Sequence, residues 1–118
     1  MPNEQIKNYI KSDKYSIQRR NQMTFPLIRQ WANDRNLIAG ATPKDQMLKL
    51  SEEHGELSKA VGKRNMVGII DGTGDMVVVL TILAAQYDLT IEDCINSAYN
   101  EIKVRKGRLV DGIFVKEA

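Results

Sequence analysis

Acidic side chains are concentrated in two short stretches of this 118-residue chain. Glu52, Glu53 and Glu56 lie close together, and Asp71 and Asp75 are four residues apart. If both stretches are helical, the members of each set lie within about one turn. Carboxylates this close repel one another unless a cation neutralises them, and oxygen ligands favour Mg²⁺ or Mn²⁺. The spacing therefore predicts a divalent-metal site with Mg²⁺ as cofactor and Mn²⁺ as an alternative.

Two other interpretations of these acidic residues remain open. Glu52 and Glu56 could be solvated on the outer face of a helix, where acidic residues near the helix start also favour the dipole. The segment 71–75 could form a calcium loop, but Met76 and an apolar run follow it, without the glycine and distal glutamate that such a loop needs. Spacing alone does not decide between the metal site and the outer face.

Helical periodicity predicts the elements that position these groups. Thr42, followed by Pro43 and Asp45, marks the clearest helix start, because Thr caps and Pro suits the first helical position. Stops are expected at Gly40 and Gly62. The predicted helices span residues 21–37, 43–61, 67–87 and 90–106. Two of them, antiparallel and joined by a short loop at 62–65, would bring the acidic stretches together near the loop.

The C-terminal pattern changes to short β-prone runs. Asp111-Gly112 joins two of them, so residues 108–116 are predicted to form a β-hairpin. An isolated hairpin is marginal in water, and it must pack on the helices or on another subunit. Residues 1–20 are predicted as an N-terminal arm, and residues 21–118 as a single helical domain that includes the hairpin.

Composition narrows the classes of function. A net charge of +2 is too small to indicate a nucleic-acid binder, and only the basic arm keeps that alternative open. The longest apolar run, Met76 to Ala85, is too short to cross a bilayer, so no membrane partner is expected. The N-terminal residues carry no secretion-signal pattern, which predicts a cytoplasmic protein. The single cysteine, Cys94, cannot form an internal disulfide and is expected in the core.

Two strings in the chain resemble a known family. Residues 49–57, KLSEEHGEL, and residues 74–80, GDMVVVL, resemble the paired acidic motifs of MazG-like nucleotide pyrophosphohydrolases. The resemblance runs from about Trp31 to Lys116, and the ending 111–116 looks like the short, single-domain branch. It implies an all-α, four-helix MazG-like domain with a small C-terminal hairpin. It also implies a homodimer or homotetramer in which helices of neighbouring subunits form bundles.

The resemblance implies an activity as well. The family reaction is Mg²⁺-dependent hydrolysis of a nucleoside triphosphate to the monophosphate and pyrophosphate, in nucleotide pool control or house-cleaning. Phosphoribosyl-ATP hydrolysis is another activity of the superfamily. By position, Glu53 and Glu56 match metal ligands of the first motif. Glu52 matches either a further ligand or the base that activates water, so Glu52 and Glu53 are the expected catalytic residues.

The second motif departs from the family pattern. Asp75 matches its aspartate, but its glutamate should stand at position 72, where this chain has Gly72. Asp71 lies on the same helical face as Asp75 and is expected to supply the missing oxygen. This departure leaves the number of metal ions open. It also motivates the alternative of a non-catalytic nucleotide- or protein-binding helical module that kept the fold.

Candidate substrate-binding residues lie elsewhere in the chain. Asn100, Lys103, Arg105 and Lys106 fall in the region that resembles the phosphate-contacting segment of the family. Each could instead be an ordinary helix-end residue, since basic groups favour the C-terminal dipole. Trp31 fits the core by its helical spacing, and its alternative role is a wall of the base pocket.

Overall fold

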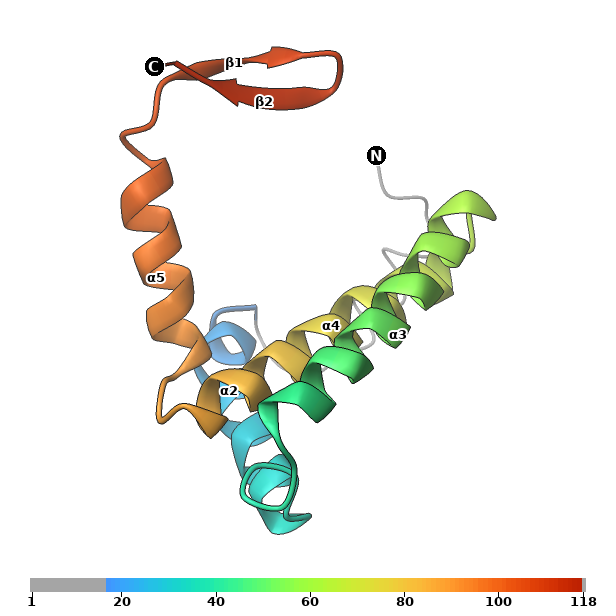
Figure 1. Ribbon diagram of the computed structural model, residues 1–118, viewed down its shortest axis with the longest axis vertical. Helices are drawn as coiled ribbons and strands as arrows, with labels where there is room; N and C mark the ends of the chain where they lie inside the picture. Colours follow the sequence, from blue (N-terminus) through green and yellow to red (C-terminus); the bar gives the residue numbers. More distant parts are fainter. Residues whose placement is uncertain (1–16, 118) are drawn as a thin grey trace.

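The computed structural model describes residues 17–117, with side chains from Thr24 onward, and these residues form four helices and a two-stranded hairpin (Figure 1). The elements are α2 (Ile17–Asp34), α3 (Pro43–Gly62), α4 (Met66–Gln86), α5 (Ile91–Ile102), β1 (Gly107–Val110) and β2 (Ile113–Lys116). The predicted mostly helical fold with a C-terminal hairpin is confirmed. Most of the predicted arm lies outside the described residues, and its last four residues begin α2.

The first turn of α3 follows the predicted start signal. Thr42 Oγ1 accepts a hydrogen bond from the Asp45 amide at 3.1 Å, and Asp45 Oδ2 accepts one from the Thr42 amide at 2.9 Å. This reciprocal pair is a capping box, which satisfies amide groups that have no partner within the helix. Pro43 occupies the first helical position, where its missing amide costs nothing.

Helix α3 ends at Gly62, as predicted, whereas α2 ends at Asp34, before the expected stop at Gly40. The left-handed φ values of 57° and 54° fall at Asn36 and Arg64 rather than at these glycines. Asn tolerates this conformation well, and at Arg64 the turn is held by an Asn65 amide that donates to the Ala60 carbonyl at 2.9 Å. α5 ends at Ile102, four residues before the predicted end.

Helix α4 is the central element of the fold. It runs antiparallel to α3 along much of its length and also contacts α2 and α5 (Figure 1). A Cβ atom added at Gly72 would lie 3.1 Å from Leu57 Cβ, and one at Gly68 would lie 3.0 Å from Ala60 Cβ. Larger side chains at these positions would push the two helices apart. The two glycines therefore set the close spacing of α3 and α4.

Polar contacts fix α2 and α5 around the C-terminal half of α4. Arg29 on α2 forms a two-pronged ion pair with Glu92 on α5, and its Nη2 donates to Glu92 Oε2 at 2.8 Å. This hydrogen bonding lowers the pKa of Glu92 and raises that of Arg29. Gln86 Nε2 donates to the Ala41 carbonyl at 3.0 Å, which ties the end of α4 to the loop before α3.

The apolar core is small for a chain of this length. Its described members are Ala32, Ala60, Val79, Ile82 and Ala84. No residue of α5 is buried, and Ile95, Tyr99 and Ile102 form an exposed stripe on one of its faces. Met47 on α3 is also about half exposed, at 49%. These apolar faces are therefore uncovered in a single chain. Cys94, which the sequence analysis expects in the core, is exposed as well, so that expectation is wrong.

Helix α4 is also long and apolar enough to cross a membrane by length and composition alone. The sequence-based prediction considered only the run 76–85, whereas the helix spans 21 residues. Buried core helices of soluble proteins pass the same test, and α4 contacts three other helices while carrying Asp71 and Asp75. Its length is thus weak support for a membrane span.

The capping box gives a stability prediction. We expect Thr42→Ala to lower the free energy of unfolding by about 1 kcal/mol, because the amide of Asp45 loses its acceptor. Urea unfolding followed by circular dichroism measures the change. Ser58→Ala, at an exposed position inside α3, is the control and should stay within about 0.5 kcal/mol of wild type. Equal stability of Thr42→Ala and wild type would contradict the role of the cap.

Candidate functional site

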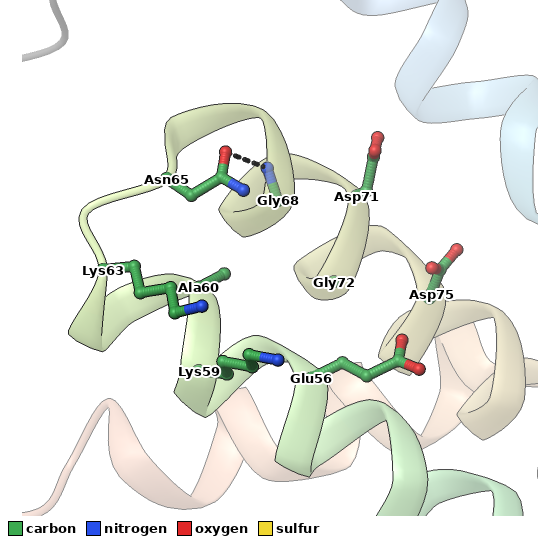
Figure 2. Close-up of a pocket in the computed structure, with 9 residues that line it drawn as sticks. All are labelled: Glu56, Lys59, Ala60, Lys63, Asn65, Gly68, Asp71, Gly72 and Asp75. Carbon is green, nitrogen blue, oxygen red and sulfur yellow. Dashed lines mark hydrogen bonds between the residues drawn. The ribbon is translucent and has the colours of Figure 1, made fainter.

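A cavity of about 400 Å³ opens between α3 and α4 near the turn that joins them (Figure 2). Glu56 from α3 and Asp71 and Asp75 from α4 line it, and Glu56 extends toward Asp75. The remaining lining residues are Lys59, Ala60, Lys63, Asn65, Gly68 and Gly72. The structure thus brings the two acidic stretches together at the loop end of the helix pair, as the sequence predicts.

Glu53 is the buried acidic residue of the first stretch. Its exposed fraction is 6%, and its Oε1 lies 3.4 Å from Lys49 Nζ. Its Oε2 is fully buried and accepts no hydrogen bond within the described residues. A buried polar atom without a partner costs about 1–3 kcal/mol, and more when it is charged. A cation bound at this oxygen would remove that cost.

Asp75 lies across the helix interface from Glu53. Loss of hydration raises the pKa of the Asp75 carboxyl above its ordinary value, and the negative charges of Glu53 and Asp71 raise it further. The positive charge of Lys49 acts in the opposite direction. Asp75 is exposed, so water screens part of this repulsion, and a cation between the two carboxyl groups would remove more of it.

These residues fit a hard divalent cation. The donor atoms that meet here are all carboxylate oxygens, the ligand type that Mg²⁺ and Mn²⁺ prefer. Among the described residues, no group of three or more His, Cys, Asp or Glu side chains is placed so that it could hold a metal ion by itself. An open set of carboxylates still suits Mg²⁺, because this ion is commonly held by one or two carboxylates together with water and substrate phosphates. The orphaned Oε2 of Glu53 supplies one such ligand.

Glu52 differs from its neighbours in the first stretch. Its side chain is 67% exposed, its Oε2 lies 3.4 Å from Lys49 Nζ, and it does not line the cavity. These features agree with the solvated outer face that the sequence left open. Its role as ligand or base stays a prediction.

Gly72 occupies the position where a second-motif glutamate is expected. It is buried in the cavity floor against Leu57, so no carboxylate comes from this position. Asp71, one residue earlier, lines the cavity and contributes to the raised pKa of Asp75. Its role as a substitute ligand stays a prediction.

Two apolar hollows lie on the other side of Asp75, between α2 and α4. The larger one, of about 540 Å³, includes Phe25, Ile28 and Val78. The smaller one, of about 380 Å³, includes Trp31, and Asp75 lines both. Trp31 is 44% exposed, so the expected place in the core is wrong for a single chain. The contribution of Phe25 was missed, although its helical spacing from Trp31 was the available signal.

The basic residues after α5 lie far from the carboxylates in a single chain (Figure 1). Asn100, Lys103, Arg105 and Lys106 line none of the three cavities described above. Arg105 Nη2 pairs with Glu101 Oε1 at 3.0 Å. The substrate-binding role of this group therefore stays a prediction.

Sequence reasoning also missed two basic residues that do line the cavity. Lys59 and Lys63 follow Glu56 by three and seven positions, which places all three on one face of α3. That spacing was the signal that could have identified them.

Comparison with known proteins gives two matches. The model of the MazG nucleotide pyrophosphohydrolase domain matches residues 41–109, which include α3, α4 and α5. The chain is also 51% identical over 59 residues to an uncharacterized 18.2 kDa protein in the rep-hol intergenic region of Haemophilus phage HP1 (strain HP1c1). That match covers 50% of this chain and 36% of the phage protein, so this chain spans about a third of that relative. No solved structure matches.

The crowding of Asp75 gives a pH-dependent prediction. A raised pKa means that the folded chain binds this proton more readily than the unfolded chain, so stability falls as the pH rises through the range above 3.8. We expect Asp75→Asn to raise the Tm at pH 7 without divalent cations, by a small amount because Asp75 is exposed and solvent screens the repulsion. The gain should disappear below the ordinary pKa of Asp75, where the wild-type carboxyl is protonated too.

Differential scanning calorimetry at both pH values measures this effect. Asp88→Asn is the matched control, because Asp88 is exposed and its left-handed φ of 58° suits Asn. Added Mg²⁺ should raise the Tm of wild type more than that of Asp75→Asn. A Tm of Asp75→Asn at or below wild type at pH 7 would contradict the account.

Proposed function

Because the chain belongs to the MazG nucleotide pyrophosphohydrolase domain family, we propose that it hydrolyses a nucleoside triphosphate to the monophosphate and pyrophosphate with Mg²⁺, or alternatively Mn²⁺. The observation that carries the proposal is the meeting of Glu53 and Asp75 across α3 and α4. Glu53 has an unpartnered buried oxygen, and the pKa of Asp75 is raised. Both features indicate a place where a cation stabilises the folded chain.

In the proposed reaction, different residues of the site have different roles. Glu53 and Asp75 would hold the cation from opposite helices, and Asp71 would add an oxygen in place of a residue 72 carboxylate. A bound divalent cation neutralises phosphate charge and lowers the pKa of water. Glu56 lines the cavity, whereas Glu52 does not, and a general base must reach its water. Glu56 is therefore the better candidate for accepting the proton.

The reaction adds one water molecule across the bridge between the α- and β-phosphates. The water oxygen bonds to one phosphorus, and the bridging oxygen leaves with the bonding electron pair on the other phosphate. One proton of the water goes to the carboxylate base and from there to solvent or product, while the second stays on the phosphate that gained the oxygen. The apolar hollows with Phe25 and Trp31 offer aromatic surface for a base beside Asp75.

A non-catalytic nucleotide-binding module is the second candidate. Gly72 favours it, because its place against Leu57 leaves the second motif without the carboxylate that the family pattern expects there. Such a module would bind nucleotide and Mg²⁺ without releasing pyrophosphate.

We also propose that the chain forms a homodimer or homotetramer. The apolar stripe of α5 is uncovered, and only 22% of the apolar stretch of α4 is buried. Hydrophobic surface of this extent on helices is typical of faces that pack against another subunit. A neighbouring subunit would also give the basic residues after α5 a route to the carboxylates that they lack within one chain.

Activity is tested by pyrophosphate release. We expect metal-dependent release from at least one canonical ribo- or deoxyribonucleoside triphosphate, lost on chelation. Glu53→Gln should lower kcat/KM by at least about 100-fold, because it removes the buried anionic ligand. Glu117→Gln, at an exposed position outside the site, is the control and should match wild type. Metal-independent release, or full activity of Glu53→Gln, would contradict the proposal, and no release from any nucleotide would favour the non-catalytic module.

The assembly is tested by light scattering coupled to size exclusion. At micromolar concentration we expect a mass of at least twice the 13.4 kDa of the chain. Replacing Ile95 with Glu in the exposed stripe of α5 should shift the mass toward the monomer, since it introduces charge into an apolar contact. A wild-type mass near that of one chain would refute the proposed oligomer.

A further inference from the structure

We infer that the turn end of the α3–α4 cavity holds the two terminal phosphates of the substrate, which leave as pyrophosphate; this inference rests on the proposed function. Its residues are Lys59 and Lys63, which line the cavity between Glu56 and the turn (Figure 2). They are distinct from the basic group after α5 that the family resemblance points to.

The ammonium groups of the two lysines place positive charge at the cavity without a carboxylate partner among the described residues. They lie four residues apart, so they follow one face of α3 as it approaches the turn. Within the described residues neither forms an ion pair, whereas Lys49, Arg29 and Arg105 each pair with a carboxylate. In Figure 2 both side chains extend along the cavity. Ammonium groups that have no carboxylate partner and share a cavity are well suited to phosphate oxygens.

The backbone around them leaves room for a phosphate chain. Gly68 and Gly72 contribute no side chains to the lining, and Ala60 contributes only a methyl group.

Helix α4 begins at Met66, directly beside this space, so its dipole adds positive potential there. Three carboxylates and two ammonium groups line the cavity, and a single divalent cation would therefore make the lining net positive.

The residues around Asp75 indicate the orientation in which the nucleotide would bind. Asp75 lines the cavity with the lysines and also lines both apolar hollows toward α2. A nucleotide has one apolar end, the base, and one strongly anionic end. The base therefore belongs beside Phe25 and Trp31, the bond to be cleaved beside Asp75, and the terminal phosphates beside Lys59 and Lys63.

Direct binding of inorganic pyrophosphate tests this inference without requiring turnover. Titration calorimetry with excess Mg²⁺ should give a Kd for Lys59→Gln/Lys63→Gln at least about tenfold above wild type, since two charge-assisted contacts are lost. Lys44→Gln, at an exposed position at the other end of α3, is the control and should bind like wild type. Lys103→Gln/Lys106→Gln tests the competing basic group after α5 in the same titration. Circular dichroism verifies that the variants fold, which is expected because all five lysines are exposed.

The outcomes separate the inference from the proposed function. A Kd for Lys59→Gln/Lys63→Gln within about twofold of wild type would overturn the inference, even if the chain releases pyrophosphate from nucleotides. Failure of wild type to bind pyrophosphate, or loss of binding only in Lys103→Gln/Lys106→Gln, would overturn it as well. Binding that depends on Lys59 and Lys63 in a chain without turnover would support the anion site and refute the hydrolase.

Discussion

The close approach of α3 and α4 is the constraint on which the rest of the structure depends. Gly68 and Gly72 permit it, since a Cβ at either position would press on Ala60 or Leu57. The same approach forces Glu53 and Asp75 to share one small region, which leaves a carboxylate oxygen without a partner and raises the pKa of its neighbour. The helix packing thus creates an electrostatic cost that a bound cation would remove, and in the proposed function folding and metal binding are linked through it.

Helix α5 and the hairpin have the least support from the rest of the chain. Arg29 on α2 pairs with Glu92 on α5, but no residue of α5 is buried, and the hairpin lies apart from the α3–α4 pair (Figure 1). A chain that buries so little of its apolar surface gains stability by association. In the proposed assembly, one subunit would supply the carboxylates, the two lysines near the turn and the apolar hollows, and a neighbouring subunit would complete their surroundings.

Local signals made much of the fold predictable. The capping box at Thr42 and the Asp111-Gly112 turn depend on neighbouring residues, so their geometry follows from the sequence. The meeting of the acidic stretches was predictable too, because a short turn between two helices leaves few arrangements. The exposure of Trp31 and of the α5 stripe was not predictable. Apolar periodicity identifies a face that needs to be covered, but not whether the covering residues come from the same chain. Lys59 and Lys63 were missed because their meaning depends on the cavity across the helix interface.

A double-mutant cycle on cation binding tests the central claim most directly. Mn²⁺ affinity, read by electron paramagnetic resonance, would be compared in wild type, Glu53→Gln, Asp75→Asn and the double variant. If the two carboxylates hold one cation across α3 and α4, each single change should remove most of the affinity, and the double variant should lose little more. Losses that simply add, or single variants that bind Mn²⁺ as wild type does, would contradict a shared site.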